Sequence, residues 1–286
     1  MSNKIKNFRI LVSGGDGQLA KSFSEIYPKQ SLFLLGKRDF DVTDRKNALK
    51  KISKFNPDII FHLASMTRGE ESAKSPELSY KINVIGTRNI VEVCKKLDIA
   101  LLFISTNEVF DGKNQFPYKE TDKPNPITVI GKNKYEAETI IRENLKKYFI
   151  VRSSWLYSKW SLNFLHAVFN KARKDKRLEL VIDEVSSPTY SLDLAKAIKK
   201  LIKTKKYGTY NLNNTGVVSR LEFAKKAFEI AEIKNIKIIP VKLESYKRLS
   251  KPPLYSALDN SKAKNIGINF PRWNVALKNF LKSNNI

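Results

Sequence analysis

The chain has 286 residues, of which 53 are Lys or Arg and 28 are Asp or Glu, so its formal net charge is +25. A single Cys and two His exclude a disulfide framework, a Cys-based zinc cage and a multi-His metal site, so we expect no metal. No apolar run approaches the roughly 18 residues of a membrane span, and a strand-like run that starts at Phe8 leaves no room for a signal peptide. We therefore expect a cytoplasmic protein without a membrane contact.

Apolar, strand-like runs alternate with amphipathic helical stretches in the first half of the chain. The predicted strands are Phe8–Ser13, Ser31–Leu35, Asp58–Ala64, Ile99–Thr106 and Tyr148–Ser153. The predicted helices are Gln18–Tyr27, Ala48–Phe55, Glu77–Lys96 and Gly131–Leu145. Continuously apolar strands that alternate with helices are typical of a parallel sheet that is covered on both faces.

The second half of the chain has a mixed pattern. Its predicted helices are Leu162–Ala172, Ser191–Ile202 and Arg220–Ile230, and its predicted strands are Leu178–Ile182, Thr209–Leu212 and Lys237–Val241. We expect an α/β fold with a Rossmann-type doubly wound parallel sheet. We expect residues 1–153 to form the dinucleotide-binding domain that is typical of this fold, and residues 154–286 to form mainly a smaller C-terminal substrate-binding lobe. Segments of that lobe are expected to return to the main sheet.

The positive charge is spread along the whole chain, and Lys far outnumbers Arg. Nucleic-acid sites favour Arg for bidentate and stacking contacts, so we expect no nucleic-acid partner. The densest clusters, Lys171–Arg177 and Lys199–Lys206, are typical of polar helix faces and ends. The charge then indicates either a solvated surface or a general attraction for anionic ligands such as dinucleotides and nucleotide sugars.

A glycine-rich turn follows the first strand and opens the first helix, with the sequence Gly14-Gly15-Asp16-Gly17-Gln18-Leu19-Ala20. Glycines at such a turn let the backbone approach a pyrophosphate, and the start of the helix presents free N–H groups to it. We therefore predict that the pyrophosphate of a dinucleotide binds at Gly14, Gly17, Gln18 and Leu19.

The residues after the second strand indicate which dinucleotide is bound. An acidic side chain at this point holds the ribose hydroxyls of NAD, whereas a basic side chain accepts the additional phosphate of NADP. The chain has Arg38 here, followed by Asp39, Asp41 and Val42. Arg38 slightly favours NADPH, and the two aspartates keep NADH open. Arg38, Asp41 and Val42 are all predicted at the cofactor.

Short motifs are distributed over nearly the whole chain: Gly14–Leu19, Asp41–Asp44, Asn83–Thr87, Val109–Gly112, Pro117–Asp122, Arg152–Tyr157, Ser187–Tyr190 and Leu258–Lys262. With these residues the chain resembles the dTDP-4-dehydrorhamnose reductase family, a branch of the extended short-chain dehydrogenase/reductases. The last three motifs are specific to this branch rather than to dinucleotide-binding folds at large.

The resemblance implies an oxidoreductase that uses NADPH or NADH to reduce the 4-keto group of a nucleotide-linked 6-deoxysugar in polysaccharide biosynthesis. In the family a Tyr protonates the new alkoxide, and a Lys four residues later binds the nicotinamide ribose. A Ser or Thr at the end of the fourth strand orients the carbonyl oxygen. Lys134 and Thr106 match the last two positions. We further expect Ala64 and Ser65 at the cofactor, and Thr67, Asn107 and Trp155 at the substrate.

The catalytic Tyr of the family is missing from this chain. Its position, four residues before Lys134, is Ile130, which has no proton to give. Tyr135 is no convincing substitute, because it lies about 140° from position 130 around a helix. A second motif has changed as well: the family's Ser-Thr-Asp-Tyr is Ser105-Thr106-Asn107-Glu108 here.

Three hypotheses follow from this departure. In the first, the site still reduces a nucleotide sugar, with its proton supplied by a buried Glu108 of raised pKa or by a water relayed by Thr106. In the second, catalysis is lost, and the chain is a regulatory subunit that binds dinucleotide and nucleotide sugar and works with an enzyme partner. In the third, the reaction is a nucleotide-sugar epimerase or dehydratase step. A homodimer is the further assembly that we consider.

Overall fold

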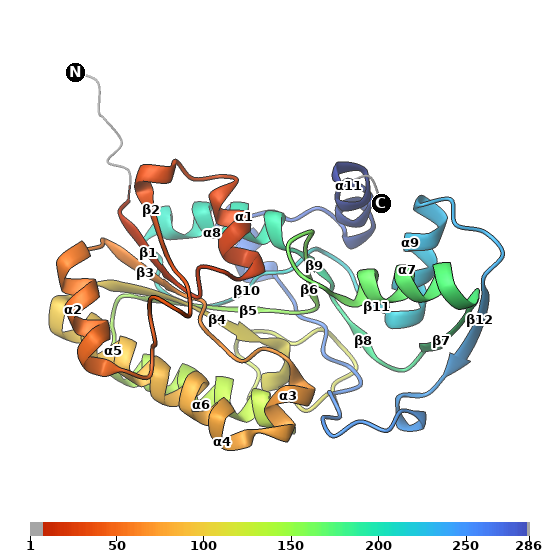
Figure 1. The fold of residues 1–286 in the computed structure, drawn as a ribbon, viewed down its shortest axis with the longest axis horizontal. Coiled ribbons are helices and arrows are strands. Elements are labelled where there is room, and N and C mark those ends of the chain that lie inside the picture. The colour runs from red at the N-terminus through yellow and green to blue at the C-terminus, as the bar shows by residue number, and fades with distance from the viewer. Residues whose placement is uncertain (1–7, 285–286) are drawn as a thin grey trace.

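The structure is a computed structural model that describes residues 8–284. Residues 1–7 and 285–286, which the two expected domain ranges include, lie outside the described residues. A six-stranded sheet with the strand order β10-β5-β4-β3-β1-β2 forms the centre of the larger lobe (Figure 1). Every neighbouring pair in this sheet is parallel. Its strands, in chain order, are β1 (Ile10–Ser13), β2 (Leu32–Leu35), β3 (Ile59–His62), β4 (Ala100–Thr106), β5 (Tyr148–Ser153) and β10 (Gly208–Asn211).

Helices cover both faces of the sheet. On one face α1 (Gln18–Ser24) packs against α8 (Ser191–Thr204), and Phe23 and Ile198 lie in one apolar cluster with Val12 of β1. The other face is covered by α2 (Arg45–Phe55), α5 (Gly86–Leu97) and α6 (Val129–Asn144). Since both faces are packed, the central strands are buried throughout, as their continuous apolar runs predict. The expected doubly wound parallel sheet is therefore confirmed.

The smaller lobe lies on the right in Figure 1. It contains three short strand pairs and has an apolar core of its own. Its strands are β6 (Leu156–Tyr157), β7 (Arg177–Val181), β8 (Val185–Ser186), β9 (Thr189–Tyr190), β11 (Val218–Ser219) and β12 (Lys237–Val241). Its helices are α7 (Phe164–Asp175), α9 (Arg220–Ile230) and α11 (Trp273–Ser283), with a short turn η4 (Leu243–Ser245). Between these segments the chain returns to the main sheet, because α8 packs on α1 and β10 pairs with β5.

The remaining short elements connect the main ones. They are η1 (Lys29–Ser31), α3 (Gly69–Lys74), α4 (Pro76–Tyr80), η2 (Lys81–Ile85), η3 (Asn107–Val109) and α10 (Ser261–Lys264).

One predicted helix differs from expectation in a way that matters for the site. The stretch Glu77–Lys96 is not a uniform α-helix, because η2 is a single π-helical turn between α4 and α5. Such turns are rare in proteins, and those that occur often lie at functional sites. Here the π turn contains Asn83, whose Oδ1 accepts hydrogen bonds from the Ser65 hydroxyl and the Met66 N–H, both at 2.8 Å. The π turn therefore fixes the loop that follows β3.

Candidate active site

A large cavity of about 1110 Å³ lies at the carboxyl ends of the central strands. Ligands of open parallel sheets bind at this edge. Residues from both lobes line the cavity, and its volume is slightly above the usual range for small-molecule sites. It lies against most of the residues that the sequence predicted for cofactor or substrate: Gly14, Gly17, Gln18, Leu19, Asp41, Val42, Ala64, Ser65, Thr67, Thr106, Asn107, Glu108, Lys134 and Trp155.

The glycine turn forms one end of the cavity. Gly14 has φ +73°, and a Cβ added there would approach the backbone nitrogen of Ala64 to 2.6 Å. Only glycine allows the turn after β1 to lie so close to the loop after β3. Gly17 is the N-cap of α1, and no side chain caps this helix start. The Gln18 side chain points across to the smaller lobe, where its Oε1 accepts hydrogen bonds from the hydroxyls of Ser158 and Ser161.

The end of β2 is arranged differently from the prediction. Arg38 is exposed and does not line the cavity, whereas its neighbour Lys37 does. The backbone N–H of Lys37 donates to Asp16 Oδ2 at 3.1 Å, which bends this loop toward the glycine turn. Asp41 also lines the cavity, and hydrogen bonds from Thr43 lower the pKa of its carboxyl. The basic side chain next to the cavity is therefore Lys37 rather than Arg38.

Lys134 lies on α6 one helical turn after Ile130, and both side chains are buried against the cavity. Its Nζ donates to the backbone oxygen of Ile104 at 2.8 Å and lies 4.5 Å from the centre of the Phe103 ring. Burial lowers the pKa of Lys134 to about 7, although the nearby Glu138 carboxylate acts in the opposite direction. Lys134 is thus an amine of lowered pKa in an apolar wall, and Ile130 offers it no polar partner.

Glu108 is the middle residue of η3, the short turn that directly follows β4 and its last residue, Thr106. Its Oε2 accepts a hydrogen bond of 2.7 Å from the hydroxyl of Thr128, the N-cap residue of α6. Burial raises the pKa of the Glu108 carboxyl, and the hydrogen bond from Thr128 opposes this shift. Among the described residues no hydrogen-bond partner is found for its second oxygen, Oε1. Glu108 is therefore a carboxyl group of raised pKa that lies at the cavity.

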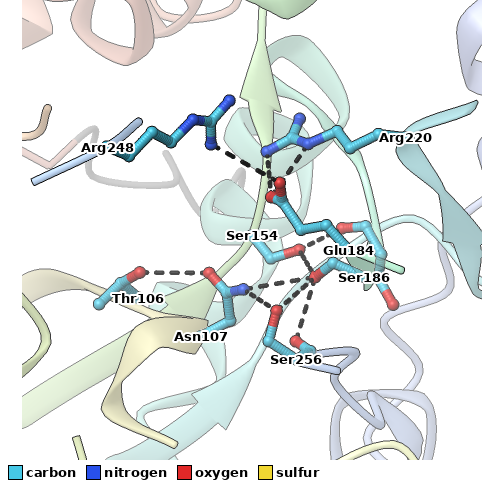
Figure 2. Close-up of polar contacts among 9 residues, drawn as sticks. Thr106, Asn107, Ser154, Glu184, Ser186, Arg220, Arg248 and Ser256 are labelled. Carbon is cyan, nitrogen blue, oxygen red and sulfur yellow. Dashed lines mark hydrogen bonds and ion pairs between the residues drawn. The ribbon is translucent and has the colours of Figure 1, made fainter. Parts of the chain in front are cut away.

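Asn107 is buried in a hydroxyl network that links the two lobes (Figure 2). Its Nδ2 donates to the Ser256 hydroxyl at 2.6 Å and to the Ser186 hydroxyl at 3.3 Å. Its Oδ1 accepts from the Thr106 hydroxyl at 3.2 Å, so the whole amide is bonded to the protein. Ser186 in turn is 2.8 Å from the hydroxyl of Ser154, which follows β5. A direct substrate contact of Asn107, as predicted, would have to replace one of these bonds.

Three charged residues that the sequence did not indicate lie on the side of the cavity formed by the smaller lobe: Glu184, Arg220 and Arg248. Figure 2 shows Glu184 between the two arginines, and the Arg220 guanidinium lies 3.5 Å from the centre of the Trp155 ring. Trp155 has φ +42°, an uncommon conformation for a bulky residue, where the chain leaves β5. Glu184 follows the predicted strand that includes Leu180, and Arg220 begins a predicted helix, but neither position alone signals a cavity.

Tyr135 and Tyr157 are the two tyrosines that we considered as proton donors in place of Ile130. Tyr135 is absent from the cavity wall and packs beside the cluster of Val109, Phe110, Tyr118 and Leu258. Tyr157 does line the cavity, but its ring is buried among aromatic side chains and burial raises the pKa of its hydroxyl well above the ordinary value. A hydroxyl of such high pKa is a poor proton donor near neutral pH.

No group of three or more His, Cys, Asp or Glu among residues 8–284 could hold a metal ion. In the same part of the chain, no helix is both long and apolar enough to cross a membrane.

Residues 8–286 match the family model described as the RmlD substrate binding domain. The chain belongs to this family. It is 31% identical to the dTDP-4-dehydrorhamnose reductase of Aggregatibacter actinomycetemcomitans, with 95% of this chain and 97% of that protein aligned. It is 30% identical to the spore coat polysaccharide biosynthesis protein SpsK of Bacillus subtilis, over 96% of this chain and 97% of the relative.

Solved structures of the family are similar along the whole chain. The dTDP-4-dehydrorhamnose reductase of Bacillus anthracis, solved in complex with NADP, superimposes with a TM-score of 0.93 at 34% identity, covering 97% of this chain and 99% of that one. A Clostridium acetobutylicum orthologue gives a TM-score of 0.92 at 30% identity, with 97% and 99% of the two chains covered. The family resemblance predicted from the motifs is thereby confirmed.

Proposed function

We propose that this protein is a cytoplasmic, NADPH-dependent reductase of a dTDP-linked 4-keto-6-deoxysugar, in which Glu108 takes the place of the family's catalytic Tyr. Relatives of about 30% identity along the whole chain are named dTDP-4-dehydrorhamnose reductase, which supports the reaction. NADP in the 34% identical structure supports the cofactor, and NADH is the less favoured alternative. The observation that carries the assignment of the acid is a cavity-lining carboxyl of raised pKa, held by Thr128 beside the Tyr-less position 130.

The residues present fit a dinucleotide. The glycine turn leaves the uncapped start of α1 at the cavity, and Lys134 Nζ uses one of its three hydrogens on Ile104. The hydroxyl of Ser153, which also lines the cavity, is buried and has no hydrogen-bond partner among the residues that the structure describes. In this proposal Gly14, Gly17, Gln18 and Leu19 hold the pyrophosphate, and Lys134 holds the nicotinamide ribose. Asp41, Val42, Ala64 and Ser65 complete the cofactor site, and we assign the NADP phosphate to Lys37 instead of Arg38.

In the proposed reaction, the protein itself supplies the proton. A bound, reduced nicotinamide supplies the hydride that the carbonyl carbon receives. The electron pair of the broken C=O π bond goes to the oxygen, and Glu108 gives its proton to that oxygen, so that the products are an alcohol and a Glu108 carboxylate. The Thr128 hydroxyl, already bonded to Oε2, then stabilises the carboxylate.

Glu108 is favoured over a water relayed by Thr106. The Thr106 hydroxyl donates to Asn107 Oδ1 and accepts the backbone N–H of Glu108, so its single proton is already engaged. Thr106 is left with acceptor capacity toward the cavity, where it orients the substrate. Thr67 and Trp155 complete the proposed substrate site, whereas Asn107 acts by holding Thr106.

Replacing Glu108 tests the proposal. We expect Glu108→Gln to lower kcat for NADPH-dependent reduction of dTDP-4-dehydrorhamnose by about 10²–10⁴-fold, because the amide cannot supply the proton. The affinity for NADPH, measured by calorimetry, should be unchanged. Ile130→Tyr in the Glu108→Gln background should restore part of the rate. Glu143→Gln, at an exposed position near the end of α6, is the matched control and should turn over like the wild type.

Other outcomes would point to a different proton donor or to a regulatory subunit. Full turnover by Glu108→Gln would eliminate Glu108 as the donor. Saturable NADPH binding without turnover by the wild type would identify a regulatory subunit, which needs an enzyme partner. A working reductase is proposed as a homodimer, and sedimentation of the purified chain distinguishes a dimer from a monomer that awaits its partner.

A further inference from the structure

A buried ion pair forms the wall of the cavity in the smaller lobe. Arg220, the first residue of α9, donates from Nε and Nη2 to the same oxygen of Glu184, Oε1, at 3.0 and 2.9 Å. Both side chains are largely buried, and the guanidinium stacks on the Trp155 ring. Phe164 lies on the guanidinium as well, 4.9 Å from ring centre to Cζ. Glu184 and two aromatic rings therefore fix the position of this cation.

Glu108 shares the cavity with this pair but is not bonded to it. Among the described residues no hydrogen bond or ion pair links Glu108 to Arg220. The pair nevertheless acts on Glu108 through space: the Glu184 charge raises the pKa of the Glu108 carboxyl, and the Arg220 charge lowers it. An Arg without its Glu184 partner would be a strong ligand for a second carboxylate in the same cavity.

The remaining charged groups near Glu108 have other partners. Arg248, from the loop after η4, reaches Glu184 Oε2 at 3.9 Å. Lys134, on the neighbouring helix α6, points its Nζ to the backbone of Ile104. The protonation of Glu108 therefore depends on burial, on Thr128 and on the balance between Glu184 and Arg220.

We propose that Glu184 is a positioning residue that holds the Arg220 guanidinium on Trp155 and thereby keeps Glu108 available as a proton donor. The use of that proton in catalysis rests on the proposed function, whereas the protonation state of Glu108 does not. The two ideas can therefore fail separately. Removal of Glu184 and removal of Arg220 should therefore have opposite effects on the titration of Glu108. A purely structural role of either residue would not produce such opposite effects.

The test is a titration of the Glu108 carboxyl in the intact chain. With ¹³C-labelled glutamate, its NMR signal is assigned by its loss in Glu108→Gln. We expect the wild-type midpoint above the ordinary Glu range. Glu184→Gln should lower the midpoint by about one pH unit or more, because the freed Arg220 then favours the carboxylate. Arg220→Gln should raise the midpoint, because Glu184 then repels the carboxylate.

The double variant Glu184→Gln/Arg220→Gln leaves no unpaired buried charge and keeps the test valid if a single variant fails to fold. Its midpoint should lie between those of the two single variants, and the control Glu143→Gln should match the wild type. An unchanged Glu108 midpoint in Glu184→Gln, or a double variant that titrates like Arg220→Gln, would overturn the proposal.

The rate profile separates this proposal from the proposed function. If Glu108 is the donor, the alkaline limb of kcat should move to lower pH in Glu184→Gln by the same amount as the NMR midpoint, with the KM for NADPH unchanged. If the NMR midpoints follow the expected order but the alkaline limb of kcat does not move with them, Glu184 still positions Arg220, and the proton donor is another group.

Discussion

Lys134 lies in largely apolar surroundings, in part because position 130 is a buried Ile. The ammonium group lies in an apolar wall formed by Ile130 and Phe103, and its nearest protein acceptor is the Ile104 carbonyl. Glu138, one turn further along α6, is bonded to Arg152 and Arg142 and is not free to pair with it. The charged form of Lys134 is therefore poorly solvated, and its proton is held weakly.

This weak proton predicts a pH-dependent stability. The pKa of Lys134 is about 7 in the folded chain, below its ordinary value of 10.5, so between these values the unfolded chain binds one more proton. The free energy of unfolding should then rise with pH in this window, by up to about 1.4 kcal/mol per unit. Below pH 7 both states are protonated and the contribution is constant.

Urea unfolding at pH 7 and pH 9 measures the effect. The difference in unfolding free energy between the wild type and Lys134→Met should shift in favour of the wild type as pH rises. Equal pH slopes for the two proteins would contradict the burial of a titrating ammonium at this position.

At the scale of elements, the two lobes are joined where β4 ends. Asn107 of η3 bonds to Ser186 of β8 and to Ser256, so one amide ties the sheet edge to two segments of the smaller lobe. Figure 2 shows that these hydroxyls form one connected set with Thr106 and Ser154. The link therefore also fixes the position of Thr106 in the cavity.

Removing this amide should weaken the link measurably. We expect Asn107→Ala to lower the free energy of unfolding by about 1–3 kcal/mol, because it leaves buried hydroxyls with fewer partners. Denaturant unfolding checks this, with the exposed Asn114→Ala as control. A change as small as that of the control would show that water or rearranged serines replace the amide without loss.

The helices, strands and turns also differ in how far the sequence could predict them. The strands and the glycine turn are local patterns, and their predictions agree with the structure within a few residues. The π turn at Lys81–Ile85 was not predicted, because the contact of Asn83 with the loop after β3 arises only in the folded chain. The same holds for the pair of Glu184 and Arg220, which are 36 residues apart in the chain. Helix α11 was missed even though its apolar positions have helical spacing.

For the whole molecule, the formal charge of +25 is not concentrated in the cavity. Acidic and basic side chains line it in equal numbers: Asp16, Asp41, Glu70, Glu71, Glu108 and Glu184 against Lys37, Arg68, Lys81, Lys134, Arg220 and Arg248. The excess of Lys therefore lies elsewhere on the molecule. It can attract anionic ligands from a distance, but recognition within the cavity depends on individual pairs.

The most direct test of the account is a crystal structure of the wild type with NADP⁺ and the reduced nucleotide sugar bound. We predict a Glu108 carboxyl oxygen within about 3.2 Å of the C4 oxygen of the sugar, with Lys134 at the nicotinamide ribose. A C4 oxygen that faces Ile130 with no side-chain donor within reach, or a dinucleotide bound away from the Gly14–Gly17 turn, would contradict it.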